Sequence, residues 1–512
     1  MKDVVIIGAG PAGITAGFEL IGSKKKYNVT IIEAENTLGG LAKTIMHAEN
    51  RMDIGGHRFF SKSKKVNRWW LKILPLQSKQ AFDYYKTERM ISLPDKGPNP
   101  YTTDKVMLKR QRISRIFYKQ KFFDYPLKLD LKTIFRLGLI NTFLCGLSYL
   151  KSLMKPLPET SLENFYINRF GRRLYKIFFE KYTEKVWGKH PSELSADWGA
   201  QRIKGVSINT LLKNAFHKKS VKETSLIEEF YYPKFGPGQL WETAAKKFVS
   251  NGGTIIKNAR VVELRFEEGK IAYVGYKING KLHFSKADYV LSSMPIKDLI
   301  TAFNIEVPEE IRQIARDLQY RDFVAIGMMV KRLKIKNDTN IKTYYETVPD
   351  NWIYIQDDNV KFGRLQIFNN WSPYLLKRSR YKNIWLGLEY FCSETDEYWK
   401  LNKQQWRQVA VADLLKAGII NTKKDVVTYC VKKVLKAYPA YYGSYDQIGK
   451  LRDYLNGIEN LYCIGRNGQH RYNNMDHSML TAFAAVDHIN GKLENKAKIW
   501  DINSEKRYHE KK

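Results

Sequence analysis

The chain has 512 residues, of which 44% are hydrophobic and 13% aromatic, so we expect two or three domains rather than one core. Its 86 Lys and Arg against 52 Asp and Glu give a net charge of +34 at pH 7. The four cysteines have neither CxxC nor metal-ligand spacing, which argues against a disulfide framework or a metal site and is typical of a reducing compartment. No signal peptide precedes the first expected strand, so we expect a cytoplasmic protein.

The positive charge is concentrated in residues 61–156, which hold 21 Lys and Arg against 6 Asp and Glu. Such a surface suits nucleic acid, an anionic membrane or anionic small substrates, and it can also be a merely solvated face. The sequence contains no nucleic-acid-binding motif, so we expect no specific nucleic-acid partner. Peripheral contact of the protein with the cytoplasmic face of an anionic membrane is one of these alternatives. The charge does not indicate an oligomeric state.

The first elements expected along the chain form a strand, a glycine turn, a helix and a second strand. Val4–Gly10 reads VVIIGAG, Pro11, Ala12 and Gly13 follow, and Val29–Glu35 reads VTIIEAE. Gly8, Gly10 and Gly13 match the GxGxxG pattern, in which glycines permit a tight turn, close approach of a pyrophosphate and helix–strand packing. Glu33 ends the second strand, where an acid accepts hydrogen bonds from ribose hydroxyls. These residues predict a Rossmann-like dinucleotide site.

The residues after Glu33 favour FAD over NAD. Gly39, Gly40 and Leu41 form a second glycine stretch that resembles the extended flavoprotein fingerprint. Further on, Met52–Phe60 reads MDIGGHRFF, in which we expect Gly56 to allow a flat ligand to approach and His57 to lie beside the isoalloxazine.

Helices dominate the next part of the predicted order. We expect helices over Lys62–Lys79, Leu162–Val186 and Trp198–Phe216, and a strand over Ser114–Tyr118. The longest apolar run, Leu137–Leu150, is too short to span a bilayer, and we expect a buried helix there.

The pattern then returns to short strands. We expect strands at Thr254–Ile256, Arg260–Phe266 and Ala287–Met294, with Val261 near the adenine of FAD. A second sheet follows, with strands predicted at Asp322–Val330, Trp352–Gln356, Arg364–Phe368 and Asn383–Tyr390. A helix at Gln404–Ala417 and a strand at Asn460–Ile464 precede Gly465 and Arg466. The last helix, Asp476–Ile489, is expected to point its N-terminus at the flavin pyrimidine.

Seven further blocks follow one another along the chain: GGLAKT, DIGGHRFFSK, EKYTEKVWG, SADWGAQRIKG, RLQIFNNWSPY, AYP and GRNGQHRYNNMDHSMLTAFAAVDHI. Together they resemble UDP-galactopyranose mutase, especially its eukaryotic-type branch, within the flavin amine oxidase and protoporphyrinogen oxidase superfamily. The resemblance implies an α/β fold: a Rossmann-like FAD-binding domain (GR2-type flavoprotein), an inserted helical domain and an antiparallel sheet that carries the substrate. The expected limits are 1–60, 226–300 and 446–495 for the FAD domain, 61–225 for the helical domain, 301–445 for the sheet and 496–512 for a basic tail.

The resemblance also implies roles for individual residues. Arg202 and Arg364 match the arginines that clamp the nucleotide diphosphate, which guanidinium groups bind in bidentate fashion, although both could instead be structural ion-pair partners. His57, Arg466 and Asp476 would lie along the flavin. The other residues expected at the substrate are Phe60, Tyr125, Lys128, Trp187, Trp371, Tyr438 and Tyr472. Of these, Trp371 replaces a tyrosine and Lys128 a glutamine of the family pattern, which puts the particular sugar and base in doubt.

The chemistry implied by the resemblance is isomerisation of a nucleotide-diphosphate sugar between pyranose and furanose forms, for surface glycan synthesis. It requires reduced FAD, with NAD(P)H as a possible external reductant, and involves no net redox change. The alternative is a redox enzyme of the same superfamily, such as an amine oxidase, a desaturase or a protoporphyrinogen oxidase, which would not need the arginine pair. A non-enzymatic FAD-binding protein is the third alternative.

Overall fold

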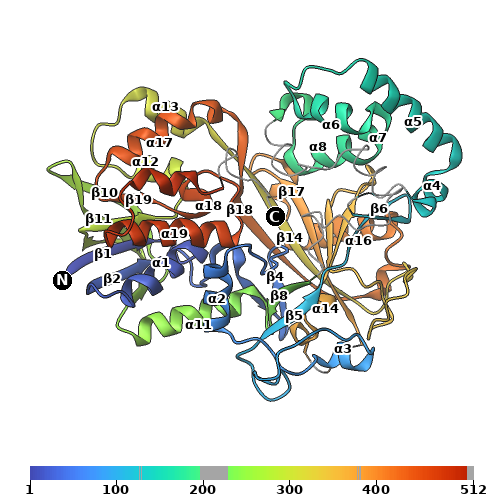
Figure 1. Ribbon diagram of the computed structural model, residues 1–512, viewed down its shortest axis with the longest axis horizontal. Helices are drawn as coiled ribbons and strands as arrows, with labels where there is room; N and C mark the ends of the chain where they lie inside the picture. The colour runs from blue at the N-terminus through green and yellow to red at the C-terminus, as the bar shows by residue number, and fades with distance from the viewer. Residues whose placement is uncertain (126, 128–129, 197–228, 378, 380–381, 504–512) are drawn as a thin grey trace.

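The structure is a computed structural model that describes residues 1–125, 127, 130–196, 229–377, 379 and 382–503 (Figure 1). One part of it is built on a five-stranded parallel sheet. The strands lie in the order β19 (Leu461–Cys463), β13 (Tyr289–Ser292), β1 (Lys2–Ile7), β2 (Tyr27–Ile32) and β9 (Thr254–Ile256).

The central strand β1 is apolar on both faces because both faces of this sheet are covered. Val4 and Ile6 pack in one core and Val5 and Ile7 in another. The first core includes residues of α1 (Pro11–Ile21), α11 (Pro237–Ser250) and α19 (Met475–Ile489). The second includes residues of α12 (Ile296–Thr301), α13 (Glu309–Asp317) and α17 (Ile448–Gly457), as well as of a three-stranded antiparallel sheet. That sheet consists of β10 (Arg260–Glu267), β11 (Lys270–Ile278) and β12 (Lys281–Lys286).

The second large sheet has seven strands and is antiparallel except between β15 and β6. Its order is β18 (Val426–Gly443), β14 (Leu318–Val330), β17 (Ile384–Cys392), β16 (Arg364–Ile367), β15 (Trp352–Ile355), β6 (Ser114–Tyr118) and β7 (Lys121–Asp124). Helix α16 (Lys403–Lys416) packs Trp406, Ala410 and Leu414 into the core on one face. Two hairpin-like pairs complete the strands: β3 (Thr44–His47) with β4 (Asn50–Asp53), and β5 (Met107–Gln111) with β8 (Glu229–Pro233).

A group of helices forms the third part, drawn in teal at one end of the molecule in Figure 1. It contains α4 (Leu131–Leu137), α5 (Leu139–Met154), α6 (Leu162–Phe170), α7 (Arg172–Tyr175), a π-helical turn (Lys176–Glu180) and α8 (Lys181–Trp187). Gly171, with φ of +77°, separates α6 from α7, so the helix predicted over Leu162–Val186 is interrupted. The predicted helix Trp198–Phe216 lies outside the described residues.

The α/β fold class is confirmed, but the predicted limits of the inserted domain need correction. Helix α2 (Lys64–Ile73) is shorter than predicted and buries Trp69 and Trp70 in the core that α1, α11 and α19 form against the five-stranded sheet. Strands β6 and β7 belong to the seven-stranded sheet rather than to a helical insertion. At the other end of the chain, Ile499 and Trp500 are buried, so the part after residue 496 starts as packed structure and not as a tail.

Candidate active site

A cavity of about 780 Å³ lies between the five-stranded and the seven-stranded sheet. One end is lined by Gly8, Glu33 and Val261, and the other by Arg58, Arg364 and Tyr438, among other residues. Parallel sheets of this kind bind ligands at the carboxyl ends of their strands, and this cavity opens where β1 and β2 end. The cavity therefore joins the predicted dinucleotide motif to the predicted substrate residues.

The glycine turn after β1 shapes the first end of the cavity. A Cβ atom on Gly8, whose φ is +96°, would lie 2.3 Å from Ser293 Oγ, and a Cβ on Gly13 would lie 1.9 Å from the Gly8 carbonyl oxygen. A Cβ on Gly10 would meet nothing nearer than the Gly40 Cα at 3.7 Å. The fold itself thus requires glycine at positions 8 and 13, whereas the space at Gly10 is left for a ligand.

Helix α1 begins at this turn and supplies its N-terminus to the cavity. Gly10 is the N-cap residue and provides no side-chain cap, so the first-turn N–H groups can bind an anion. Gly10, Pro11, Ala12, Gly40 and Leu41 line the cavity here. This cradle fits a pyrophosphate.

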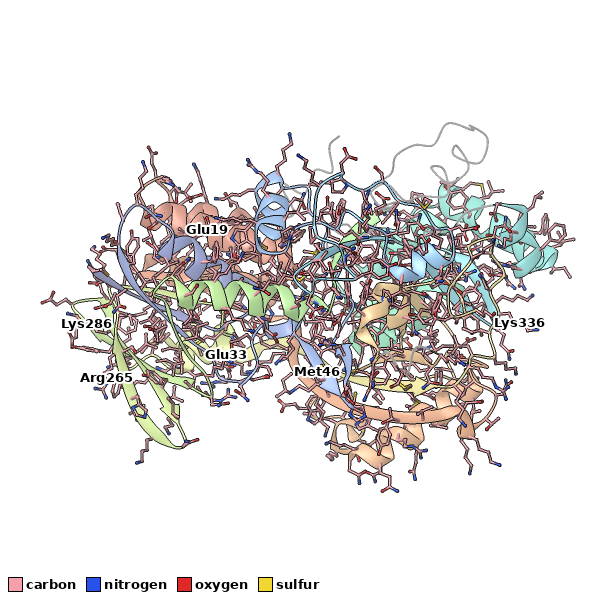
Figure 2. All side chains as sticks on the ribbon, turned by 90° about the horizontal axis from the view of Figure 1, so that it is seen from below. Glu19, Glu33, Met46, Arg265, Lys286 and Lys336 are labelled. Carbon is pink, nitrogen blue, oxygen red and sulfur yellow. The ribbon has the colours of Figure 1, made fainter. Side chains whose placement is uncertain are left out.

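Glu33 at the end of β2 is held in a fixed position by the backbone. Its carboxylate accepts hydrogen bonds from the N–H groups of Ala9 at 2.7 Å and Glu35 at 2.8 Å. Its lone pairs that are not used by these two bonds can accept from ribose hydroxyls. Figure 2 shows Glu33 in the part of the molecule that also carries Arg265 and Lys286 of the three-stranded sheet.

His57 lies on the cavity wall with a defined tautomer. Its Nδ1 is 2.9 Å from the Gly55 carbonyl oxygen. A carbonyl can only accept, so Nδ1 carries the proton and Nε2 keeps a lone pair. Burial and the nearby Arg466 lower the pKa of His57 to about 4, which leaves the imidazole neutral at pH 7. The neighbouring Gly56 also lines the cavity, and the fold requires glycine there because a Cβ would lie 1.9 Å from Trp352 Cζ3.

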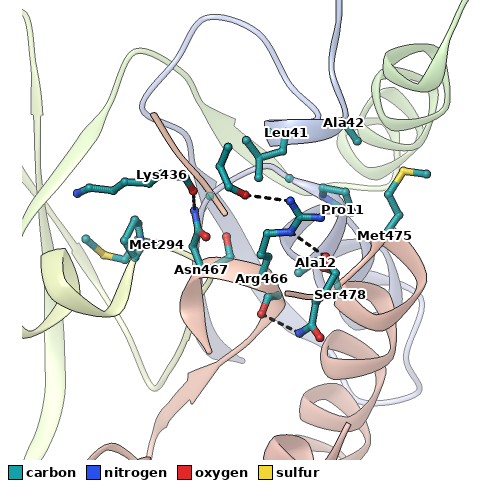
Figure 3. A pocket seen from close by; sticks show the side chains of 18 of the residues that line it. Pro11, Ala12, Leu41, Ala42, Met294, Lys436, Arg466, Asn467, Met475 and Ser478 are labelled. Atoms are coloured by element: carbon teal, nitrogen blue, oxygen red, sulfur yellow. Dashed lines mark hydrogen bonds between the residues drawn. The ribbon is translucent and has the colours of Figure 1, made fainter. Parts of the chain in front are cut away.

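The segment before α19 holds Arg466 in a fixed position against the cavity (Figure 3). Its Nε donates to the Asn473 carbonyl at 2.8 Å and its Nη1 to the Ala437 carbonyl at 2.9 Å. In Figure 3 the guanidinium lies among the labelled Pro11, Ala12 and Leu41. A positive charge is thereby fixed next to the glycine turn.

The last helix, α19, starts close to the same wall. Gly465 N donates to Thr481 Oγ1 at 2.8 Å, and Asp476 in the first turn of α19 accepts from Ser61 Oγ at 3.0 Å. Both Gly465 and Asp476 line the cavity, and the partial positive charge of the helix N-terminus lies at this end of α19. The N-terminus of α19 therefore lies at the cavity wall, where the flavin ring is predicted.

Arg364 belongs to a buried network at the other end of the cavity. Its Nε donates to the Tyr182 hydroxyl at 3.0 Å, and its Nη1 lies 3.2 Å from both the Tyr438 hydroxyl and Glu389 Oε2. Burial alone would lower the pKa of Arg364, but Tyr182, Tyr438 and Glu389 raise it well above its ordinary value. Arg364 is therefore permanently charged.

Glu389 is the partner of Arg364 on the neighbouring strand, where the two residues are in register. Gln366 Nε2 also donates to it at 2.8 Å. Burial raises the pKa of Glu389, although Arg364 and Gln366 stabilise its charged form. The ion pair means that part of the charge of Arg364 is already balanced within the protein.

Arg58 is another cation in the cavity wall, and it has no carboxylate partner among the described residues. Its Nη1 is buried without a hydrogen-bond acceptor among the described residues. Burial and the nearby Arg112 lower its pKa to about 10, so it stays charged at pH 7. Buried donors are nearly always paired, so this Nη1 is a candidate contact for an anionic ligand or for a water molecule.

Aromatic rings line the space between Arg58, Arg364 and Arg466. The Tyr438 and Tyr472 rings stack with centroids 5.5 Å apart, and the Arg466 guanidinium lies 4.7 Å from the Tyr472 centroid. Phe60 also lines the cavity and is half-exposed. This end of the cavity thus combines flat apolar faces with positive charge.

Most predicted site residues meet at this cavity. Those that line it are Gly8, Gly10, Pro11, Ala12, Glu33, Gly40, Leu41, Gly56, His57, Phe60, Val261, Arg364, Tyr438, Gly465, Arg466, Tyr472 and Asp476. Gly13 and Gly39 lie behind the wall, where they support the turn. Lys128 and Arg202 lie outside the described residues.

Three predicted substrate residues are not part of the cavity wall. Trp371 is fully buried in the core, where its Nε1 donates to the Asn351 carbonyl at 2.8 Å, so the prediction that it contacts substrate is wrong. Trp187 is also buried and contacts the Tyr438 ring edge-to-face from behind. Tyr125 packs against Tyr354 with ring centroids 4.5 Å apart and does not line the cavity.

Two site residues were missed in the sequence. Glu389 is the only acid in the buried strand IWLGLEYFC, and a lone charge in such a strand is a signal that could have been used. Arg58 stands in the GGHRFF segment directly after His57, but nothing in the spacing distinguishes it from a surface arginine.

The fold and the cavity together define a class of proteins, the flavin-dependent enzymes with a Rossmann-like domain and a sheet over the flavin. Comparison with protein families narrows this class, because residues 11–360 match the family of flavin containing amine oxidoreductases. The chain belongs to this family, whose cofactor is FAD.

Solved structures agree with the fold. A reduced UDP-galactopyranose mutase is similar with a TM-score of 0.78 and 20% sequence identity, covering 98% of this chain and 96% of that one. A putative protoporphyrinogen oxidase from Exiguobacterium sp. 255-15 has a TM-score of 0.66 and 15% identity, with 96% and 99% covered. A putrescine oxidase bound to putrescine has a TM-score of 0.59 and 14% identity, with 96% and 99% covered.

Proposed function

We propose that this protein is an FAD-dependent isomerase of a nucleotide-diphosphate sugar, which interconverts pyranose and furanose forms for glycan synthesis. The observation that carries the proposal is Arg58, whose buried Nη1 has no acceptor among the described residues. Arg364 and Arg466 line the same cavity, and of these Arg364 is paired with Glu389 behind the wall. Such a site attracts a diphosphate and repels an amine cation.

The cofactor would be held by the glycine turn after β1 and by Glu33 after β2. The N–H groups at the start of α1 would bind the pyrophosphate, and Glu33 would accept from the ribose. Reduced FAD, when bound, supplies the electron-rich centre for the reaction, and NAD(P)H is a candidate external reductant. His57 stays neutral at pH 7, so its Nε2 lone pair offers an acceptor beside the cofactor.

The arginines would act on the diphosphate as it leaves the sugar and returns. Negative charge on the bridging oxygen grows when the bond to the anomeric carbon breaks, and fixed guanidinium groups stabilise that charge. Arg364 is held for this role by Tyr182, Tyr438 and Glu389. Arg58 would complete its missing hydrogen bond on a phosphate oxygen, and Arg202 remains a predicted third contact.

The test is equilibrium binding of uridine diphosphate to the purified FAD-loaded protein. We expect binding that weakens by at least about tenfold in Arg58→Ala, because a hydrogen bond to a charged group contributes roughly 1.5–3 kcal/mol. Lys62→Ala, which removes a basic residue that does not line the cavity, is the matched control and should bind normally. Absence of binding in the native protein would reject the diphosphate site.

A second candidate is an FAD-dependent oxidoreductase of the amine oxidase, protoporphyrinogen oxidase or desaturase type. The observation in its favour is the Arg364–Glu389 ion pair, which balances one cation inside the protein and so weakens its pull on an anion. Such an enzyme would consume oxygen or another acceptor in proportion to its substrate.

A further inference from the structure

Helices α4 and α5 present an apolar face to the outside of the molecule. Nine apolar side chains on this pair are each at least 46% exposed: Leu131, Phe135, Leu139, Ile140, Phe143, Leu147, Leu150, Leu153 and Met154. The prediction of a buried helix over Leu137–Leu150 is therefore wrong. A contiguous group of exposed apolar side chains is typical of an interaction site in a folded protein.

The apolar residues form a continuous stripe on α5. Ile140, Phe143, Leu147, Leu150 and Met154 are spaced by three and four residues, so they share one side of the helix. The buried residues Cys145, Tyr149 and Ser152 occupy the opposite side. Helix α5 is therefore apolar on its exposed side, where a surface helix normally carries polar residues.

Gly138 sets the orientation of the two helices. Its φ of +88° allows a bend of 105° between α4 and α5. Within the described ranges no single helix is long and apolar enough to cross a membrane, and the α4–α5 pair meets that test only when its two helices are taken together. Figure 1 shows both helices at the outer edge of the molecule, on the side away from the five-stranded sheet.

Positive charge surrounds the stripe. From Leu131 to Pro156 the chain has four Lys and Arg and no Asp or Glu. A cavity of about 430 Å³ lies beside the junction of α4 and α5. The described residues that line it include five cations and no acid. The five are Lys119, Lys121, Arg136, Arg173 and Lys176, of which Arg136 is paired with Asp338.

We propose that α4 and α5 dock on an anionic phospholipid bilayer, with the apolar stripe in the acyl-chain boundary and the basic cavity at the headgroup phosphates. An apolar helix face flanked by cations is the arrangement by which peripheral proteins lie in the membrane interface. A second copy of the chain is disfavoured as the occupant, since two such faces would bring eight like charges together.

The test uses the full-length protein and flotation with two kinds of vesicle, phosphatidylcholine alone and phosphatidylcholine mixed with phosphatidylglycerol. We expect binding to the mixed vesicles that persists in part at high salt, because apolar burial is not screened. The triple variant Ile140→Gln, Phe143→Gln, Leu147→Gln should bind at least about tenfold more weakly, since each side chain contributes apolar burial. All three side chains are exposed, so the fold should be retained.

The matched control is the pair Leu282→Gln and Phe284→Gln, which changes exposed apolar residues of β12 on another part of the molecule. The control should bind vesicles as the native protein does. Arg173→Ala with Lys176→Ala should weaken binding mainly at low salt. Equal binding by the triple variant, no binding to mixed vesicles at low salt, or a native dimer that the triple variant converts to monomer would each overturn the proposal.

Discussion

Replacing Gly10 by alanine should separate cofactor binding from folding. The new Cβ would lie 3.7 Å from the Gly40 Cα, an ordinary contact, and the backbone there has a φ of −81° that alanine adopts readily. Gly10 is the N-cap of α1, where alanine is less favourable than glycine by about 1 kcal/mol or less. The apoprotein should therefore remain folded with almost unchanged stability.

The same methyl group would occupy the approach of the pyrophosphate. Loss of one backbone hydrogen bond to a charged group costs roughly 1.5–3 kcal/mol, which corresponds to about tenfold to hundredfold weaker FAD binding. The assay is titration of apoprotein with FAD, followed by flavin fluorescence, together with urea unfolding of the apoprotein.

Gly13→Ala is the matched comparison one helical turn away. Its Cβ would lie 1.9 Å from the Gly8 carbonyl oxygen, so strand and helix must move apart. Such overpacking typically costs about 1–3 kcal/mol, and this variant should lose stability of the apoprotein as well as FAD. Normal FAD affinity in Gly10→Ala, or equal destabilisation of both apoproteins, would refute the assignment of the turn.

Three further predictions concern charge. Arg364→Ala and Arg202→Ala should each reduce turnover at least about tenfold with FAD still bound. Lysine at either position should restore activity only in part, because it lacks the planar guanidinium group that binds phosphate in bidentate fashion. Unchanged steady-state kinetics would contradict this. Burial raises the pKa of Asp53 to about 7, so its charged form destabilises the fold and the native protein loses stability as pH rises from about 4 through about 7. Asp53→Asn should remove this loss, and thermal unfolding should show a larger stability gain of the variant at about pH 8 than at about pH 5; an equal gain at both pH values would contradict this. His57 should stay neutral at all pH values well above its pKa of about 4, and an imidazole NMR signal that titrates near its ordinary pKa would contradict the buried tautomer.

The first strand, the glycine turn and the first helix could be predicted in detail because short-range sequence patterns determine them. The alternation of VVIIGAG, the glycine spacing and Glu33 specify strand, turn and helix without reference to distant contacts. Strands β9 and β16 begin at the residues predicted for them, Thr254 and Arg364. The partner of Arg364 could not be predicted, since it depends on the register between β16 and β17.

Other features depended on tertiary packing that periodicity does not contain. The apolar run of α5 has the composition of a core helix, and only the arrangement of its neighbours leaves Ile140 and Phe143 exposed. Trp371 stands at a position where the resembling family has a pocket residue, but Phe230, Tyr232 and Trp352 enclose it in an aromatic core. Strand β18 was missed because its lysines and Pro439 interrupt the apolar pattern.

The most direct test of the proposed function is a stoichiometric measurement on the FAD-loaded protein. Dithionite-reduced enzyme is incubated without oxygen with UDP-galactopyranose and related nucleotide sugars, and products and flavin absorbance are followed together. The account predicts isomerised nucleotide sugar in many turnovers while the flavin stays reduced and no further reductant is consumed. Unchanged nucleotide sugars, combined with oxidised enzyme that consumes oxygen one-for-one with an amine or a porphyrinogen, would contradict it.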